Sequence, residues 1–83
     1  MRIDLYLKQS RLIKRRKLAN EACVKGLVLV NGLVAKPSLA LKVGDKITLN
    51  LAAKQIVVKV LSLKPSRYDL MYELISESYY KKA

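Results

Sequence analysis

The stretch GLVLVNG, residues 26–32, decides the fold, because the spacing of the apolar residues changes within it. Gly26 is the residue type that most often ends a helix. Leu27 to Val30 form a short aliphatic run, and the Asn31-Gly32 dipeptide strongly favours a two-residue hairpin turn. We therefore expect a helix to end near residue 25, a strand over 27–30 and a return strand over 33–36.

Upstream of this stretch, apolar residues recur at intervals of three and four, which is the period of an amphipathic helix. Two such stripes predict helices over about 2–10 and about 15–25. The stripes consist of Ile3, Tyr6 and Leu7, and then of Leu18, Ala19, Ala22 and Cys23.

Downstream, apolar and polar residues alternate with the period of a half-buried strand. The alternation runs over 47–51 and 56–60, and we expect these two strands to pair. The predicted fold class is therefore α+β, with two N-terminal helices packed on a small, mainly antiparallel β-sheet. Residues 1–64 are expected to form the domain, and residues 65–83 a C-terminal tail that is either a short helix or extended.

Positive charge dominates the composition. The 83 residues contain 17 lysines and arginines against 6 acidic residues, a formal net charge of +11. Residues 1–17 alone carry seven cations and one carboxylate, Asp4. Such a chain repels itself unless a polyanion neutralises it, and nucleic acid is the commonest polyanionic partner. An anionic membrane surface is the second candidate, weakened because the first predicted helix has no broad exposed apolar face.

The residue types needed for most catalytic sites are missing. The sequence contains no histidine, which excludes histidine-based triads and most zinc sites. It has neither a glycine-rich phosphate loop nor a Cys-x-x-Cys pair, and its single cysteine, Cys23, lies on an apolar helical stripe typical of core packing. We expect no enzyme activity, catalytic residue, metal or cofactor, and we expect the protein to be cytoplasmic.

The basic segment contains the residues that fit RNA binding. We expect five cations to converge on one phosphate-lined groove: Lys8, Arg11, Lys14, Arg15 and Arg16. Arginine can also stack on an exposed base. Of the five tyrosines, Tyr6 is expected in the core and the other four lie outside the basic segment. The sequence therefore favours recognition of RNA shape and phosphates over stacking on single-stranded bases.

Five motifs in a fixed order resemble the RNA-binding domain first described in ribosomal protein S4. They are RIDLYL at 2–7, SRLIKRRKLA at 10–19, GLVLVNG at 26–32, AKPS at 35–38 and VGDKI at 43–47. The resemblance covers about residues 2–51 and is greatest to the stand-alone bacterial members, the RqcP and heat shock protein 15 family, with RqcP the closer of the two. One departure is Arg15, which stands where many of these domains have the Ser or Thr that caps the second helix.

The resemblance implies a two-helix RNA-binding motif, known as the alpha-L motif, with RNA against the helices and the hairpin. It also implies that Asp4 orients the neighbouring basic side chains. Taken with the basic segment, it gives these candidate RNA-binding residues: Arg2, Lys8, Ser10, Arg11, Lys14, Arg15, Arg16, Lys36 and Ser38.

Members of this family act in ribosome-associated quality control. The resemblance implies a monomeric factor that binds large-subunit ribosomal RNA and peptidyl-tRNA, and that assists the RqcH tailing factor in extending stalled nascent chains at their C-termini. Two alternatives remain open: a general ribosomal RNA-binding or ribosome-assembly factor, and the detached RNA-binding module of an RNA-modifying enzyme.

Overall fold

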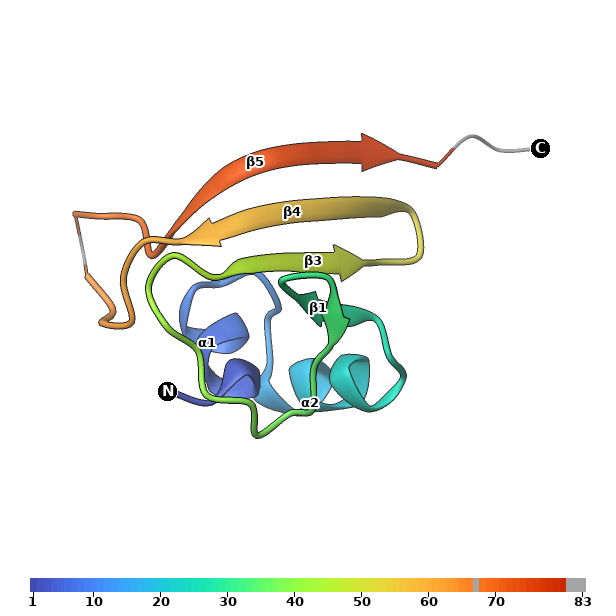
Figure 1. The fold of residues 1–83 in the computed structure, drawn as a ribbon, viewed down its shortest axis with the longest axis horizontal. Helices are drawn as coiled ribbons and strands as arrows, with labels where there is room; N and C mark the ends of the chain where they lie inside the picture. The colour runs from blue at the N-terminus through green and yellow to red at the C-terminus, as the bar shows by residue number, and fades with distance from the viewer. Residues whose placement is uncertain (67, 81–83) are drawn as a thin grey trace.

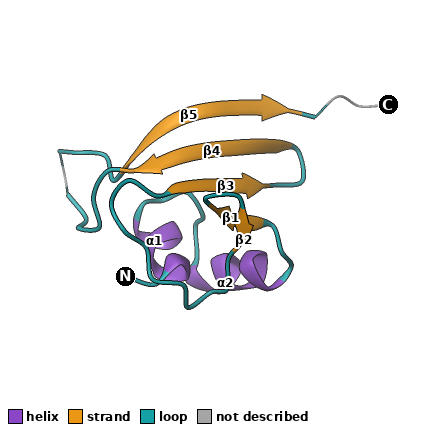
Figure 2. Cartoon of the chain, in the orientation of Figure 1, coloured by secondary structure: helices purple, strands orange, loops and turns teal. Residues whose placement is uncertain are grey.

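The computed structural model describes residues 1–66 and 68–80 and forms two layers, helices on one side and a sheet on the other (Figures 1 and 2). The helices and strands have these bounds: α1 Ile3–Gln9, α2 Arg16–Val24, β1 Val28–Val30, β2 Leu33–Val34, β3 Lys46–Asn50, β4 Lys54–Val60 and β5 Tyr72–Tyr79. The strand order is β2-β1-β3-β4-β5, and all neighbouring strands are antiparallel. The predicted α+β class, the two helices and the first four strands are confirmed.

The chain reverses after α2 where the sequence predicted it. Gly26 has a φ of 77°, the left-handed conformation that ends a helix most readily on glycine. Asn31 and Gly32, with φ of 51° and 85°, both adopt the positive φ of a type I′ hairpin turn. Arg15 precedes α2 and makes no side-chain capping hydrogen bond. An arginine side chain carries no oxygen that could accept from the backbone N–H groups of the first turn.

The core lies between the helices and one face of the sheet. Ile3, Tyr6 and Leu7 of α1 are fully buried against sheet residues such as Ile47 and Leu49. In α2 only Ala19 and Cys23 are buried, and Leu18, expected on the same stripe, is 48% exposed. Neighbouring helical residues point about 100° apart, so a narrow stripe of small side chains leaves Leu18 on its flank.

The C-terminal segment differs from one of the two predicted conformations. A helix over this segment is wrong: its residues 72–79 form β5, an edge strand paired with β4 along its length, while its residues 67 and 81–83 lie outside the described part of the chain. The extended alternative is right in conformation, but the segment is part of the sheet. Glu77 of β5 forms an ion pair with Lys54 of β4 at 3.1 Å. No helix within the described residues is long and apolar enough to cross a membrane.

Candidate nucleic-acid interface

A buried carboxylate organises the N-terminal end of α1. Asp4 is 3% exposed, and both of its oxygens accept hydrogen bonds from Arg2, Oδ1 from Nε at 3.2 Å and Oδ2 from Nη2 at 3.1 Å. Nη2 of Arg16, at the start of α2, lies 3.6 Å from Oδ1. The Arg2 and Arg16 side chains are 49% and 48% exposed. Asp4 therefore holds two arginines, one just before α1 and one at the start of α2, at one place on the surface.

The surroundings of Asp4 keep it ionised. Burial alone would raise the pKa of the carboxyl. Hydrogen bonds from the Asn20 side chain, the backbone N–H of Leu5 at 2.8 Å and the Arg2 side chain, together with the charge of Arg16, lower the pKa below its ordinary value. The expectation that Asp4 orients neighbouring basic side chains agrees with this geometry.

The loop after the hairpin brings two more candidate residues to the same end of α1. The backbone N–H of Ile3 donates to the carbonyl oxygen of Leu39 at 2.9 Å, and that of Asp4 to Pro37 at 3.3 Å. Lys36 and Ser38, which flank this contact, are both exposed. We name the surface formed by Arg2, Arg16, Lys36 and Ser38 around Asp4 the Asp4 cluster.

A second basic surface lies at the opposite end of α1. Lys8, Arg11 and Lys14 line one shallow hollow together with Gln9 and Pro65. We name it the Lys8 hollow. Arg11 has a φ of 66°, a left-handed conformation that is unfavourable for side chains with a Cβ. It occupies the position after α1 where glycine is usual, so arginine at this position makes the fold less stable than glycine would.

The remaining two candidates are less closely tied to either surface. Ser10 is half-buried, and its hydroxyl donates to the carbonyl oxygen of Leu7 at 3.3 Å. Arg15 is exposed between the two helices. The cations were predicted to converge on one groove, but the structure distributes them over two surfaces that α1 connects.

Comparison with known proteins identifies the family of this chain. Residues 1–47 match the S4 domain family. An RQC P-site tRNA stabilizing factor from Streptococcus pneumoniae is 49% identical over 82 residues, covering 94% of this chain and 93% of the relative. The chain belongs to the S4-domain family of RQC P-site tRNA stabilizing factors. A protein of the same name from Listeria monocytogenes is 42% identical over 81 residues, covering 93% and 88%.

A solved structure agrees with the S4-domain assignment. Heat shock protein 15 of Vibrio cholerae superposes with a TM-score of 0.79 and 27% identity, over 92% of this chain and 82% of that chain. That relative was solved as a trimer. The predicted RNA-binding family is confirmed, whereas the individual RNA-binding residues and the monomeric state stay predictions.

One aromatic residue of this S4-domain protein was not expected near the basic residues. Tyr68 lies far from residues 1–17 in sequence, yet it lines the same pocket as Gln9, Ser10 and Arg11. The Tyr6 hydroxyl produces this proximity by donating to the Met71 carbonyl oxygen at 2.6 Å, which fixes the chain after β4 against α1. The contact joins two residues that are 65 positions apart, so the sequence around either residue gives no indication of it.

Cys23 behaves as a core residue of the S4 domain. It is buried, and burial raises the pKa of its thiol to about 11, with the charge of Asp4 contributing in the same direction. A thiol with this pKa is protonated at neutral pH and is a poor nucleophile. Among the described residues, no group of three or more acidic, cysteine or histidine side chains is placed to hold a metal ion.

Proposed function

We propose that this protein is a non-catalytic RNA-binding factor of ribosome-associated quality control, and that it holds the P-site tRNA on the large ribosomal subunit. The relatives at 49% and 42% identity are named for stabilising that tRNA. The Asp4 cluster is the structural observation that supports this function, because it presents two fixed, half-exposed guanidinium groups, one from just before α1 and one from the start of α2. Guanidinium groups bind phosphate oxygens in defined, often bidentate geometry.

Two basic surfaces on one small domain suit a factor that contacts two RNA molecules. The Asp4 cluster and the Lys8 hollow lie at the two ends of α1, a helix of seven residues and therefore about 10 Å long. We propose that they divide ribosomal RNA and tRNA between them. Each contact can then be weak alone, because the second one forms at high effective concentration once the first is made.

The finer elements of the role follow from this division. We propose that the protein acts as a monomer in the cytoplasm, where ribosomes translate. By keeping the peptidyl-tRNA in place, it would assist the RqcH tailing factor while the stalled chain is extended.

Sedimentation of the tagged protein in an extract of its own cells tests this function. The protein should migrate with the large subunit, and sequencing of RNA crosslinked to it should recover both ribosomal RNA and tRNA. Arg16→Ala should move it to the top of the gradient. Lys59→Ala, which removes an equal charge from an exposed position on β4, should not. Recovery of ribosomal RNA without tRNA would favour a general ribosomal RNA-binding factor instead.

A further inference from the structure

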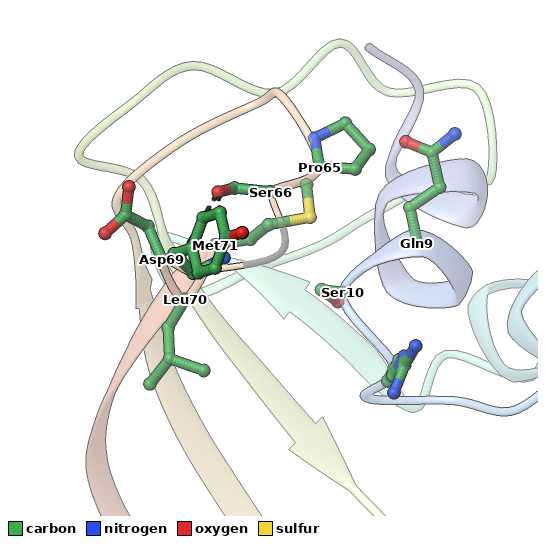
Figure 3. Close-up of a pocket in the computed structure, with 9 residues that line it drawn as sticks. Gln9, Ser10, Pro65, Ser66, Asp69, Leu70 and Met71 are labelled. Carbon is green, nitrogen blue, oxygen red and sulfur yellow. Dashed lines mark hydrogen bonds between the residues drawn. The ribbon is translucent and has the colours of Figure 1, made fainter.

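A pocket between the C-terminal end of α1 and the segment after β4 adjoins the Lys8 hollow and extends beyond it (Figure 3). Gln9, Ser10 and Arg11 line it on the helix side, and Pro65, Tyr68 and Met71 on the other. Its volume of about 540 Å³ is typical of small-molecule sites. We propose that this pocket receives one unstacked nucleobase of the bound RNA, an inference that rests on the proposed RNA-binding function.

The flat side chains of the pocket fit the face of a base. Tyr68 is 92% exposed, so its ring is available to a ligand. Arg11 lines the same pocket with a guanidinium group, which is also planar. Bases that leave the helical stack bind proteins by stacking on aromatic rings and on guanidinium planes. The pocket thus offers both groups at one place.

The position of the pocket next to the Lys8 hollow fits a nucleotide rather than a free small molecule. The two share Gln9, Arg11 and Pro65, so they are continuous across the end of α1. A phosphate bound over Lys8, Arg11 and Lys14 would place the base of the same or the adjoining nucleotide at the mouth of the pocket. Phosphate contacts position the RNA, and the pocket would select a base that is free to leave the stack.

The Tyr68 side of the pocket is anchored to the rest of the domain. The Met71 carbonyl oxygen accepts from the Tyr6 hydroxyl and from the backbone N–H groups of Leu61 and Ser62, at 2.6, 2.9 and 3.1 Å. The Ser66 hydroxyl oxygen accepts from the backbone N–H of Tyr68 at 3.2 Å. Met71 is thus held in place before any RNA binds, which reduces the entropy lost on binding at this end of the pocket.

Gln9 supplies a polar group that the folded protein leaves unpaired. Its Oε1 is buried and accepts no hydrogen bond within residues 1–66 and 68–80. A buried acceptor without a donor destabilises a protein. Rotation of the carboxamide toward the pocket would let it accept from and donate to the edge of a base, the pairing that glutamine makes with nucleobases elsewhere.

Three RNA hairpins with the same stem test the proposal: one fully paired, one with a single bulged adenosine and one with an abasic bulge at that position. The abasic hairpin keeps the backbone distortion and removes only the base. At one fixed salt concentration, the protein should bind the adenosine bulge at least about fivefold more tightly than the abasic bulge, the low end of what base–aromatic stacking contributes.

Variants then assign the preference to the pocket. Tyr68→Ala should abolish the difference between the adenosine and abasic bulges, and Tyr68→Phe should retain it because the ring remains. Gln9→Met should reduce the preference while leaving the melting temperature unchanged or higher. Arg16→Ala should weaken binding to all three hairpins by the same factor, because the Asp4 cluster contacts phosphates.

The possible failures are distinguishable. Equal affinity for the adenosine and abasic bulges, with strong binding to both, would overturn the base pocket and leave the proposed RNA-binding function standing. A preference for adenosine that survives Tyr68→Ala would also overturn it, by placing the base elsewhere. Failure to bind any of the three hairpins would overturn the pocket and the RNA-binding function together.

Discussion

Replacing Asp4 with asparagine separates the amount of positive charge on the RNA surface from its arrangement. Asp4→Asn removes a negative charge next to Arg2 and Arg16, so charge alone predicts tighter binding to phosphate. It also removes the carboxylate that fixes both guanidinium groups. If RNA binding depends on that arrangement, affinity should fall by about threefold or more despite the gain in net charge, because each freed side chain loses rotamer entropy on binding.

The stability change in Asp4→Asn follows from the exposure of the partners. Arg2 and Arg16 are about half exposed, so water solvates them once the carboxylate is gone. Exposed ion pairs contribute roughly 0.2–1 kcal/mol each, so the loss of two pairs should lower the free energy of unfolding by about 0.4–2 kcal/mol. For a domain of this size the melting temperature should then fall by roughly 2–16 °C.

The pH dependence of stability provides a second readout. The pKa of Asp4 is lower in the folded state than its ordinary value of 3.8. Its contribution to stability is therefore complete above that ordinary value and is lost as the pH falls through the lower pKa of the folded state. In Asp4→Asn, the fall in stability that protonation of Asp4 causes at low pH should be absent. The falls caused by protonation of the other carboxylates should remain.

Fluorescence anisotropy with a structured RNA over a salt series measures the binding change. If about five phosphates are neutralised, log affinity should fall with log salt with a slope of about −3.5 to −4.5, and the slope should be the same in the variant. Glu73→Gln, on exposed β5, makes an equal charge change away from the cluster. Tighter RNA binding by Asp4→Asn, equal to that of Glu73→Gln, would refute the orienting role.

Three further outcomes are expected. Arg11→Gly should weaken RNA binding while raising the free energy of unfolding by up to about 1 kcal/mol, because glycine tolerates the φ of 66°; lower stability with unchanged affinity would show a structural role. Leu49→Ala should lower the free energy of unfolding by about 2–5 kcal/mol because Leu49 is fully buried. Arg16→Ala should lower it by less than about 1 kcal/mol and reduce RNA affinity. Similar losses of melting temperature in the two variants would show that core and surface are misassigned. Cys23, with a thiol pKa of about 11, should react with iodoacetamide at pH 8 only after denaturant is added, and rapid labelling of the native protein would contradict its burial.

The parts of the fold that sequence analysis predicted are those set by local chemistry. Asn31-Gly32 dictates its turn because both residues tolerate positive φ. The alternation over 56–60 gives a strand because every second side chain is buried. The candidate site residues were identifiable because cations concentrate in residues 1–17, and Asp4 stood out as the single carboxylate among them.

The parts that were missed depend on pairing between distant segments. β5 has mostly exposed side chains, so it lacks the buried alternation that marks a strand. Opposite the junction of Val57 and Val58 the register skips Ile75, which marks a bulge. The neighbouring apolar residues Leu74 and Ile75 therefore do not follow the simple alternation of a strand. Tyr68 lies in the Arg11 pocket because hydrogen bonds between distant residues, such as that between Tyr6 and Met71, hold the segment after β4 against α1.

Binding to three ribosomal particles, at one salt concentration, separates the proposed role from general RNA affinity. The particles are the large subunit with peptidyl-tRNA in the P site, the empty large subunit and the small subunit. If the protein contacts ribosomal RNA and tRNA together, its affinity for the tRNA-loaded large subunit should exceed that for the empty one by at least about tenfold. Arg2→Ala, Arg11→Ala and Arg16→Ala should each reduce that preference. All three particles expose dense phosphate, so equal affinity for the three would contradict a tRNA-stabilising role and leave a general ribosomal RNA-binding protein.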